Sequence, residues 1–189
     1  LAYVGRQSND AYSRAAMNGT FISVDGKGTL IRYNVGLRNR GKGSRIPPPN
    51  NYRVNFPQDR RWKGVSAINI NSKYTYLQVL GNAMFRMAGL PALKATRVQV
   101  RVNGQNLALN DPDKMHGSYV HLEVYDSEWA ENHLPGDAEG NLYRCASRGW
   151  HCDLRYLGDN PTAYGREDYY AKNTNAAEND WSDLIRLTN

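Results

Sequence analysis

The chain has 189 residues, of which 40% are hydrophobic and 22% are charged, a composition that excludes an intrinsically disordered protein. It contains no apolar run of the roughly 18 residues that a membrane-spanning helix needs, and its two cysteines are too few for a disulfide-rich scaffold. The net charge of +6 is uneven, because residues 1–94 carry 15 basic and 3 acidic side chains and residues 95–189 carry 9 and 15.

Short extended segments are predicted for much of the first 70 residues. Residues 1–18 are weakly patterned, and we expect them to form a lead-in segment. After them, alternating and β-branched runs bounded by glycine or proline predict strands. The predicted strands are residues 20–24, 29–40, 52–56 and 65–70. Three consecutive prolines at 47–49 predict a loop over residues 41–50.

The pattern then changes to a helical period. Apolar residues recur at spacings of three and four over residues 77–88, which predicts one amphipathic helix, and Gly89–Pro91 predicts its end. The apolar positions of this helix are Leu77, Leu80, Met84 and Phe85. We expect them to pack on a sheet that contains Val98, Val100 and Val102. Burial of Phe85 is expected to contribute most to stability.

The remaining segments complete an α+β pattern. Residues 96–103 and 117–124 are predicted strands, and Asn103-Gly104 is a strong hairpin signal. A helical turn at 128–132, an extended segment at 140–144 and a helix at 181–187 follow. This order predicts an antiparallel sheet with one main helix packed against it.

The basic hairpin and its glycine loop are the clearest candidate site. Its members are Arg38, Arg40, Gly41, Gly43, Ser44 and Arg45. The planar guanidinium of arginine has a fork of N–H donors that matches phosphate oxygens, and glycines let the backbone approach an anion closely. Two arginines that are two positions apart on a strand share one face. The spacing is not that of a Walker loop. The alternative is a solvated basic face that balances the acidic half of the chain.

Several ordered segments resemble the spore-coat CotH kinase-like family. They are Gly36–Arg45, Asn51–Phe56, Ala88–Pro91, Val102–Gly104, Gly117–Glu123, Gly140–Arg144 and Tyr170–Asn175. Each motif is short, but their shared order runs from about Val24 to the last residue. The resemblance implies an atypical protein-kinase-like domain over residues 19–189, incomplete at its C-terminal end, with the first lobe and the start of the second.

The resemblance also implies an activity and a place in the cell. Family members use ATP and Mg or another divalent metal to phosphorylate Ser on secreted or surface proteins, and a bacterial parent is implied. The metal-binding aspartates are expected beyond this chain, so no catalytic residue is assigned within it and the isolated chain is expected to be inactive. Arg53 is implied at the position of the kinase strand lysine, Glu123 at the nucleotide hinge, and Arg144 and Lys172 as supporting residues.

Other interpretations stay open. Nucleic acid is a weaker candidate partner, because the second half is acidic and no nucleic-acid-binding signature is present. A non-catalytic structural or binding module of a cell-surface protein is the main alternative to a kinase. Cys145 and Cys152 are either a local disulfide, as in a secreted protein, or free thiols, and the spacing does not favour a zinc site.

Overall fold

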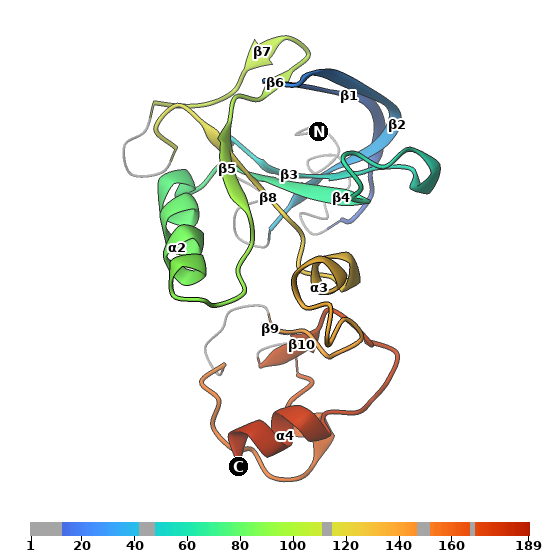
Figure 1. Cartoon of the computed structure of the whole chain (residues 1–189), viewed down its shortest axis with the longest axis vertical. Helices are drawn as coiled ribbons and strands as arrows, with labels where there is room; N and C mark the ends of the chain where they lie inside the picture. The colour runs from blue at the N-terminus through green and yellow to red at the C-terminus, as the bar shows by residue number, and fades with distance from the viewer. Residues whose placement is uncertain (1–12, 42–47, 111–114, 147–151, 167–168) are drawn as a thin grey trace. The chain divides into compact units, whose positions relative to one another are not determined.

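The computed structural model describes residues 13–41, 48–110, 115–146, 152–166 and 169–189. The chain forms two compact units, residues 1–124 and residues 125–189. The first unit contains a curled sheet and a long helix, and the second contains two short helices, a small hairpin and extended segments (Figure 1). No helix in the described part of the chain is long and apolar enough to span a membrane.

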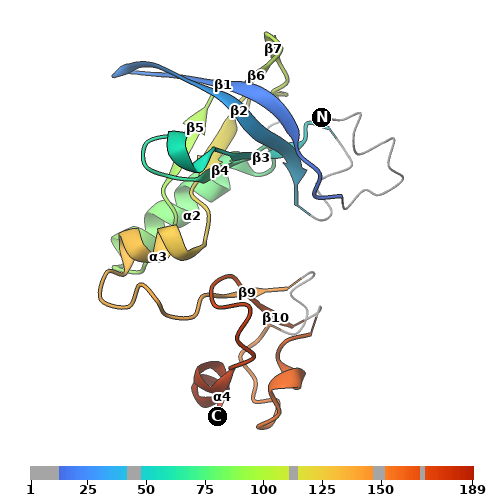
Figure 2. The same ribbon diagram turned by 90° about the vertical axis from the view of Figure 1, so that its right-hand side faces the viewer.

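A six-stranded antiparallel sheet organises the first unit, in the order β1-β2-β3-β4-β8-β5. Its strands are β1 (Met17–Asp25), β2 (Gly28–Arg40), β3 (Asn51–Asn55), β4 (Ala67–Asn71), β8 (Tyr119–Leu122) and β5 (Ala95–Val98). Figure 2 shows the long β1–β2 hairpin curving across the unit. A short 3-10 turn, η1 (Gln58–Arg60), lies between β3 and β4.

A separate two-stranded hairpin, β6 (Arg101–Val102) with β7 (Gln105–Asn106), follows β5. Its turn residues Asn103 and Gly104 have φ values of 51° and 78°. Two consecutive positive φ angles are what a tight turn of this hairpin class requires, and Asn-Gly adopts them most easily. The predicted hairpin is confirmed.

One face of the large sheet forms the hydrophobic core of the first unit. Alternate residues of β2, β3 and β4 face it because strand side chains alternate between the two faces. The buried cluster consists of Val35, Tyr52, Val54, Phe56, Ile68, Ile70, Met115 and Tyr119. Phe21 and Trp62 pack at its border, with ring centroids 5.8 Å apart.

Helix α2 (Thr75–Met87) confirms the predicted helix, but the predicted packing of its apolar face is wrong. The four apolar side chains are exposed by 49% at Leu77, 55% at Leu80, 61% at Met84 and 55% at Phe85. The three valines expected beneath them pack on the core cluster instead. The rotation of α2 is set by polar bonds: Thr75 is buried, and its Oγ1 donates to the Met115 carbonyl at 2.8 Å.

The second unit is built on α3 (Ser127–His133), β9 (Tyr143–Cys145), β10 (Tyr170–Lys172), the short 3-10 turn η2 (Pro161–Ala163) and α4 (Ser182–Thr188). Asp126 caps α3 by accepting a hydrogen bond from the Trp129 amide at 3.2 Å. The apolar cluster of the second unit consists of Tyr164, Tyr170, Trp181 and Leu184. The two units together confirm the α+β class.

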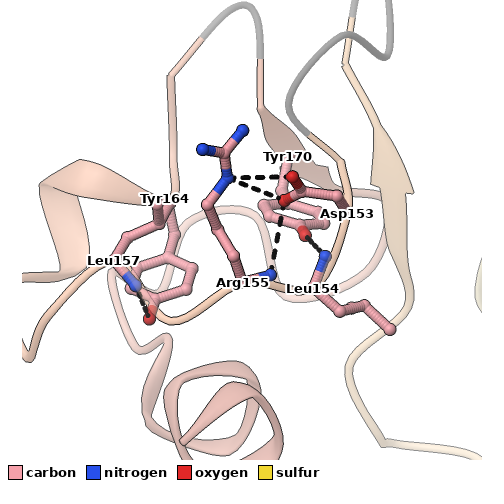
Figure 3. Close-up of polar contacts among 6 residues, drawn as sticks. All are labelled: Asp153, Leu154, Arg155, Leu157, Tyr164 and Tyr170. Carbon is pink, nitrogen blue, oxygen red and sulfur yellow. Dashed lines mark hydrogen bonds and ion pairs between the residues drawn. The ribbon is translucent and has the colours of Figure 1, made fainter.

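Two tyrosine hydroxyls hold residues 154–157, which precede η2 (Figure 3). The Leu154 amide donates to the Tyr170 hydroxyl and the Leu157 amide donates to the Tyr164 hydroxyl, both at 2.9 Å. Both hydroxyls belong to residues of the buried cluster, so this segment is fixed to the core of the unit rather than to its surface.

Candidate functional site

The face of the sheet opposite the core carries the predicted phosphate-binding arginines. In the register of the sheet, Arg38 is directly opposite Arg53, and Arg53 is directly opposite Asn69. Arg40, two residues beyond Arg38, and Asn71, two residues beyond Asn69, lie on the same side because side chains alternate. These five residues define what we call the arginine face.

Two arginines occupy one cross-strand pair on this face. Like charges directly opposite each other destabilise a sheet. Arg53 is half-buried, and its Nε donates to Asn55 Oδ1 at 2.8 Å, which fixes the position of its guanidinium. Arg38 is also half-buried. Two guanidinium groups held on adjacent strands suit an anion with several oxygens.

A chain of side-chain amides connects Arg40 to α2. Arg40 Nη1 donates to Asn71 Oδ1, and Asn71 Nδ2 donates to Gln78 Oε1 at 2.8 Å. Gln78 Nε2 donates in turn to the Lys73 carbonyl. This relay ties the end of β2, the end of β4 and the first turns of α2 together.

Asn69 connects the arginine face to the end of β8. Asn69 Nδ2 donates to the Glu123 carbonyl at 3.2 Å, and the side chain is only 7% exposed. Its Oδ1 is buried and has no hydrogen-bond partner among the described residues. A buried acceptor without a partner is costly, so this atom is a candidate contact for a ligand donor.

Glu123 directly precedes the boundary of the two units, which lies after Val124. Its Oε2 accepts from the Lys94 amide at 2.7 Å, and its own amide donates to the Lys94 carbonyl at 3.4 Å. These contacts fasten the residue to the segment before β5. Its implied role at a nucleotide hinge stays a prediction.

The glycine loop falls largely outside the described residues. Gly43, Ser44 and Arg45 belong to the segment 42–47, of which nothing is described. Gly41 directly follows β2 and has a φ of 97°, in the region that favours glycine. The backbone therefore departs from the strand immediately after Arg40.

The two implied supporting residues lie in the second unit. Arg144 pairs with Ala171 and Lys172 pairs with Tyr143 in the β9–β10 register, so their side chains leave opposite faces of that hairpin. Arg144 Nε donates to Asn173 Oδ1 at 2.9 Å. Lys172 Nζ donates to the Asp180 carbonyl at 3.0 Å. Each side chain holds a local turn and the hairpin does not bring the two together.

Cys145 and Cys152 form a disulfide, which decides between the two states left open by their spacing. The described residues contain no group of three or more His, Cys, Asp or Glu that could hold a metal ion.

Asp183 accepts hydrogen bonds from the Tyr143 hydroxyl and from Asn141 Nδ2. Although burial raises the pKa of Asp183, these bonds outweigh it and leave the pKa below its usual value.

A family model described as CotH kinase protein matches residues 37–189. The chain belongs to the CotH kinase family. The match begins at residue 37 rather than near Val24, so β1 and most of β2 lie outside it. All the candidate site residues of this CotH chain, from Arg38 to Lys172, lie within the matched segment. No curated protein matches the chain.

The sequence-based prediction missed three residues: Asn69 and Asn71 of the CotH arginine face, and Gln78 of α2, which bonds to Asn71. A signal for two of them is present in the sequence. Asn69 and Asn71 alternate with Ile68 and Ile70, and every residue of β4 is buried. Asparagines on one side of such an apolar strand indicate a polar partner on that side, since buried amides are normally hydrogen-bonded.

Proposed function

We propose that this CotH family chain provides the phosphate-binding part of an atypical ATP-dependent protein kinase that phosphorylates Ser on secreted or surface proteins. The observation that carries the proposal is the direct pairing of Arg38 with Arg53 on β2 and β3, with Arg40 on the same face. Family membership supports a kinase-like function in general terms. The arginine face supports the proposal that phosphate binding belongs to this part of the chain.

The proposed role of the arginines is to hold the phosphate groups in place through their positive charge. Phosphoryl transfer needs positive charge around the phosphates and correct alignment more than covalent chemistry from the protein. Arg38, Arg40 and Arg53 would bind the phosphate oxygens and offset their negative charge. Gly41–Arg45, Glu123, Arg144 and Lys172 remain proposed contributors.

The kinase-like family also suggests a divalent metal such as Mg. Its usual ligands are carboxylates and phosphate oxygens. The described residues provide no carboxylate group of that kind. We therefore derive no catalytic step through a metal from these residues.

A location outside the cytoplasm is part of the proposal. Disulfides form and persist in oxidising compartments and are rare in cytosolic proteins. The Cys145–Cys152 bridge supports secretion or display at the cell surface. The spore-coat association of the family points to the surface of a bacterium or its spore.

A non-catalytic binding module of a cell-surface protein is the second candidate. The apolar face of α2 favours it, because exposed clusters of large apolar side chains often mark interaction sites. The apolar face belongs to α2 and the arginine face belongs to β2, β3 and β4, so the two functions are not mutually exclusive.

Thermal unfolding with and without anions tests the phosphate site. ATP and pyrophosphate should raise the melting temperature of the wild type, and Arg40→Ala should reduce the rise. Stabilisation by a ligand at a hundredfold excess over its Kd is about 2.7 kcal/mol. Arg60→Ala removes an exposed arginine of η1 and is the matched control. An equally charged non-phosphate polyanion should have less effect on the wild type.

Equal shifts with both kinds of anion, in the wild type and Arg40→Ala alike, would reduce the arginine face to a general basic surface. A full response in Arg40→Ala and a lost response in Arg60→Ala would place the site elsewhere.

A further inference from the structure

Helix α2 presents its polar side inward and its apolar side outward. Thr75 is buried and Gln78 and Asn82 are half-buried, whereas Leu80, Met84 and other large apolar residues are exposed. Hydrophobic burial alone favours the reverse orientation. The orientation of α2 must therefore be set by the polar contacts that its inner side makes.

Gln78 is held at both ends of its amide. Its Oε1 accepts from Asn71 Nδ2 at 2.8 Å and its Nε2 donates to the Lys73 carbonyl. These two bonds allow one orientation of the amide, because the oxygen only accepts and the nitrogen only donates. The α2 helix thereby determines which way the Asn71 side chain turns.

The orientation of the Asn71 amide determines which of its atoms faces Arg40. With its Nδ2 engaged by Gln78, Asn71 presents Oδ1 as the acceptor for Arg40 Nη1. A guanidinium carries five N–H donors in a rigid fork, so a bond to Asn71 and bonds to an anion are compatible. Each amide in the relay is used as both donor and acceptor.

We propose that Gln78 and Asn71 are positioning residues for Arg40, which orient its guanidinium for a phosphate group on the arginine face. The inference rests on the proposed phosphate-binding function. Both relay residues are neutral amides. A carboxylate in the place of Asn71 would also hold Arg40, but it would compete with the phosphate for the charge of the guanidinium.

Preorganisation is the physical benefit of the relay. An unrestrained arginine loses much side-chain freedom when it binds an anion, and that loss weakens binding. A guanidinium that is already oriented loses less. Breaking the relay should therefore reduce the affinity for phosphate while leaving the charge of the face unchanged.

The test is a double-mutant cycle on the 189-residue chain, with pyrophosphate affinity measured by isothermal titration calorimetry. Gln78→Met is close to isosteric and removes both amide bonds. It should weaken binding about tenfold in the wild-type background and have almost no effect in an Arg40→Ala background. Asn82→Ala is the matched control, because Asn82 Nδ2 donates to the backbone carbonyl of Gln78 at 2.8 Å and not to the side-chain amide that belongs to the relay.

Equal losses from Gln78→Met in both backgrounds would show that Gln78 acts independently of Arg40 and would overturn the inference. Unchanged affinity in Gln78→Met, with a wild type that binds and an Arg40→Ala variant that does not, would overturn it while leaving the phosphate site intact. Failure of the wild type to bind pyrophosphate would overturn both this inference and the proposed phosphate site.

Asn71→Asp provides a second variant in case Gln78→Met unfolds. It keeps an acceptor for Arg40, but it loses the Nδ2 donor to Gln78 and adds a negative charge beside the guanidinium. The inference expects this variant to bind pyrophosphate more weakly than the wild type. A stable Asn71→Asp variant with wild-type affinity would contradict it.

Discussion

Arg38 on β2 and Arg53 on β3 are direct cross-strand neighbours on the face of the sheet opposite the hydrophobic core. Such a pair of like charges destabilises a sheet relative to a neutral pair. The arrangement is unfavourable for the free protein and favourable once an anion lies between the two guanidinium groups. Its effect on stability should therefore change sign with the ligand.

We predict that Arg53→Gln leaves the melting temperature unchanged or raises it slightly at low salt without an anion. With saturating pyrophosphate the same variant should melt below the wild type. In 1 M salt the Debye length falls to about 3 Å, so the ligand-free difference should shrink. Differential scanning calorimetry in these conditions measures all three effects. A variant that melts below the wild type in all of them would show that Arg53 only supports the fold.

The exposed face of α2 predicts a small effect of Phe85→Ala. An exposed side chain contributes little, so the free energy of unfolding should fall by about 0.5 kcal/mol or less. Ile68→Ala, at a position that is 1% exposed in the core cluster, should cost about 2–5 kcal/mol. Urea unfolding of the two variants makes the comparison. A cost at Phe85 similar to that at Ile68 would mean that something covers this face of α2.

The Cys145–Cys152 bridge should stabilise the second unit. Its partners are seven residues apart, and closing so short a loop in the unfolded chain is worth about 2–3 kcal/mol in the chain-entropy estimate. Reduction, or replacement of both cysteines by serine, should lower the unfolding midpoint of residues 125–189 and leave the core of the sheet protected. Hydrogen exchange read separately for the two units checks this. Loss of protection mainly in the sheet would contradict it.

Acidification should weaken the first unit through His121. Burial lowers the pKa of its imidazole, and Nε2 has no hydrogen-bond partner among the described residues. The unfolded chain, with a pKa of about 6.5, then binds more protons than the native state as the pH falls. This part of the stability is complete above a pH of about 6.5, falls as the pH drops from there towards the lower folded pKa, and does not change further below that pKa.

His121→Phe should therefore flatten the dependence of unfolding free energy on pH between about 7 and 5. It keeps an aromatic ring beside Trp62, whose centroid lies 5.3 Å from that of His121. The other three histidines remain as internal controls. A variant with the wild-type slope would assign the pH dependence to one of those.

Local patterns in the sequence determined most of the elements of this protein. The single strand predicted over residues 96–103 is an exception, because it is divided into β5 and β6, which belong to different sheets. Strand alternation, the period of three to four over residues 77–88 and the Asn103-Gly104 turn depend on neighbours in the chain, and each predicted its element within a few residues. The family could also be inferred from the order of short motifs. The arginines of β2 were predicted as a candidate site from the dense run of basic residues, the adjoining glycines and the resemblance to the family.

Only the tertiary structure decided which surfaces meet. Periodicity shows that α2 has an apolar face but not where it points, and the bonds of Thr75 and Gln78 to distant segments set its rotation. The pairing of Arg38 with Arg53 and the relay from Arg40 through Asn71 depend on strand register across loops. Such contacts join residues far apart in the chain. Their geometry is fixed by the packing of the whole sheet, so no local sequence pattern predicts it.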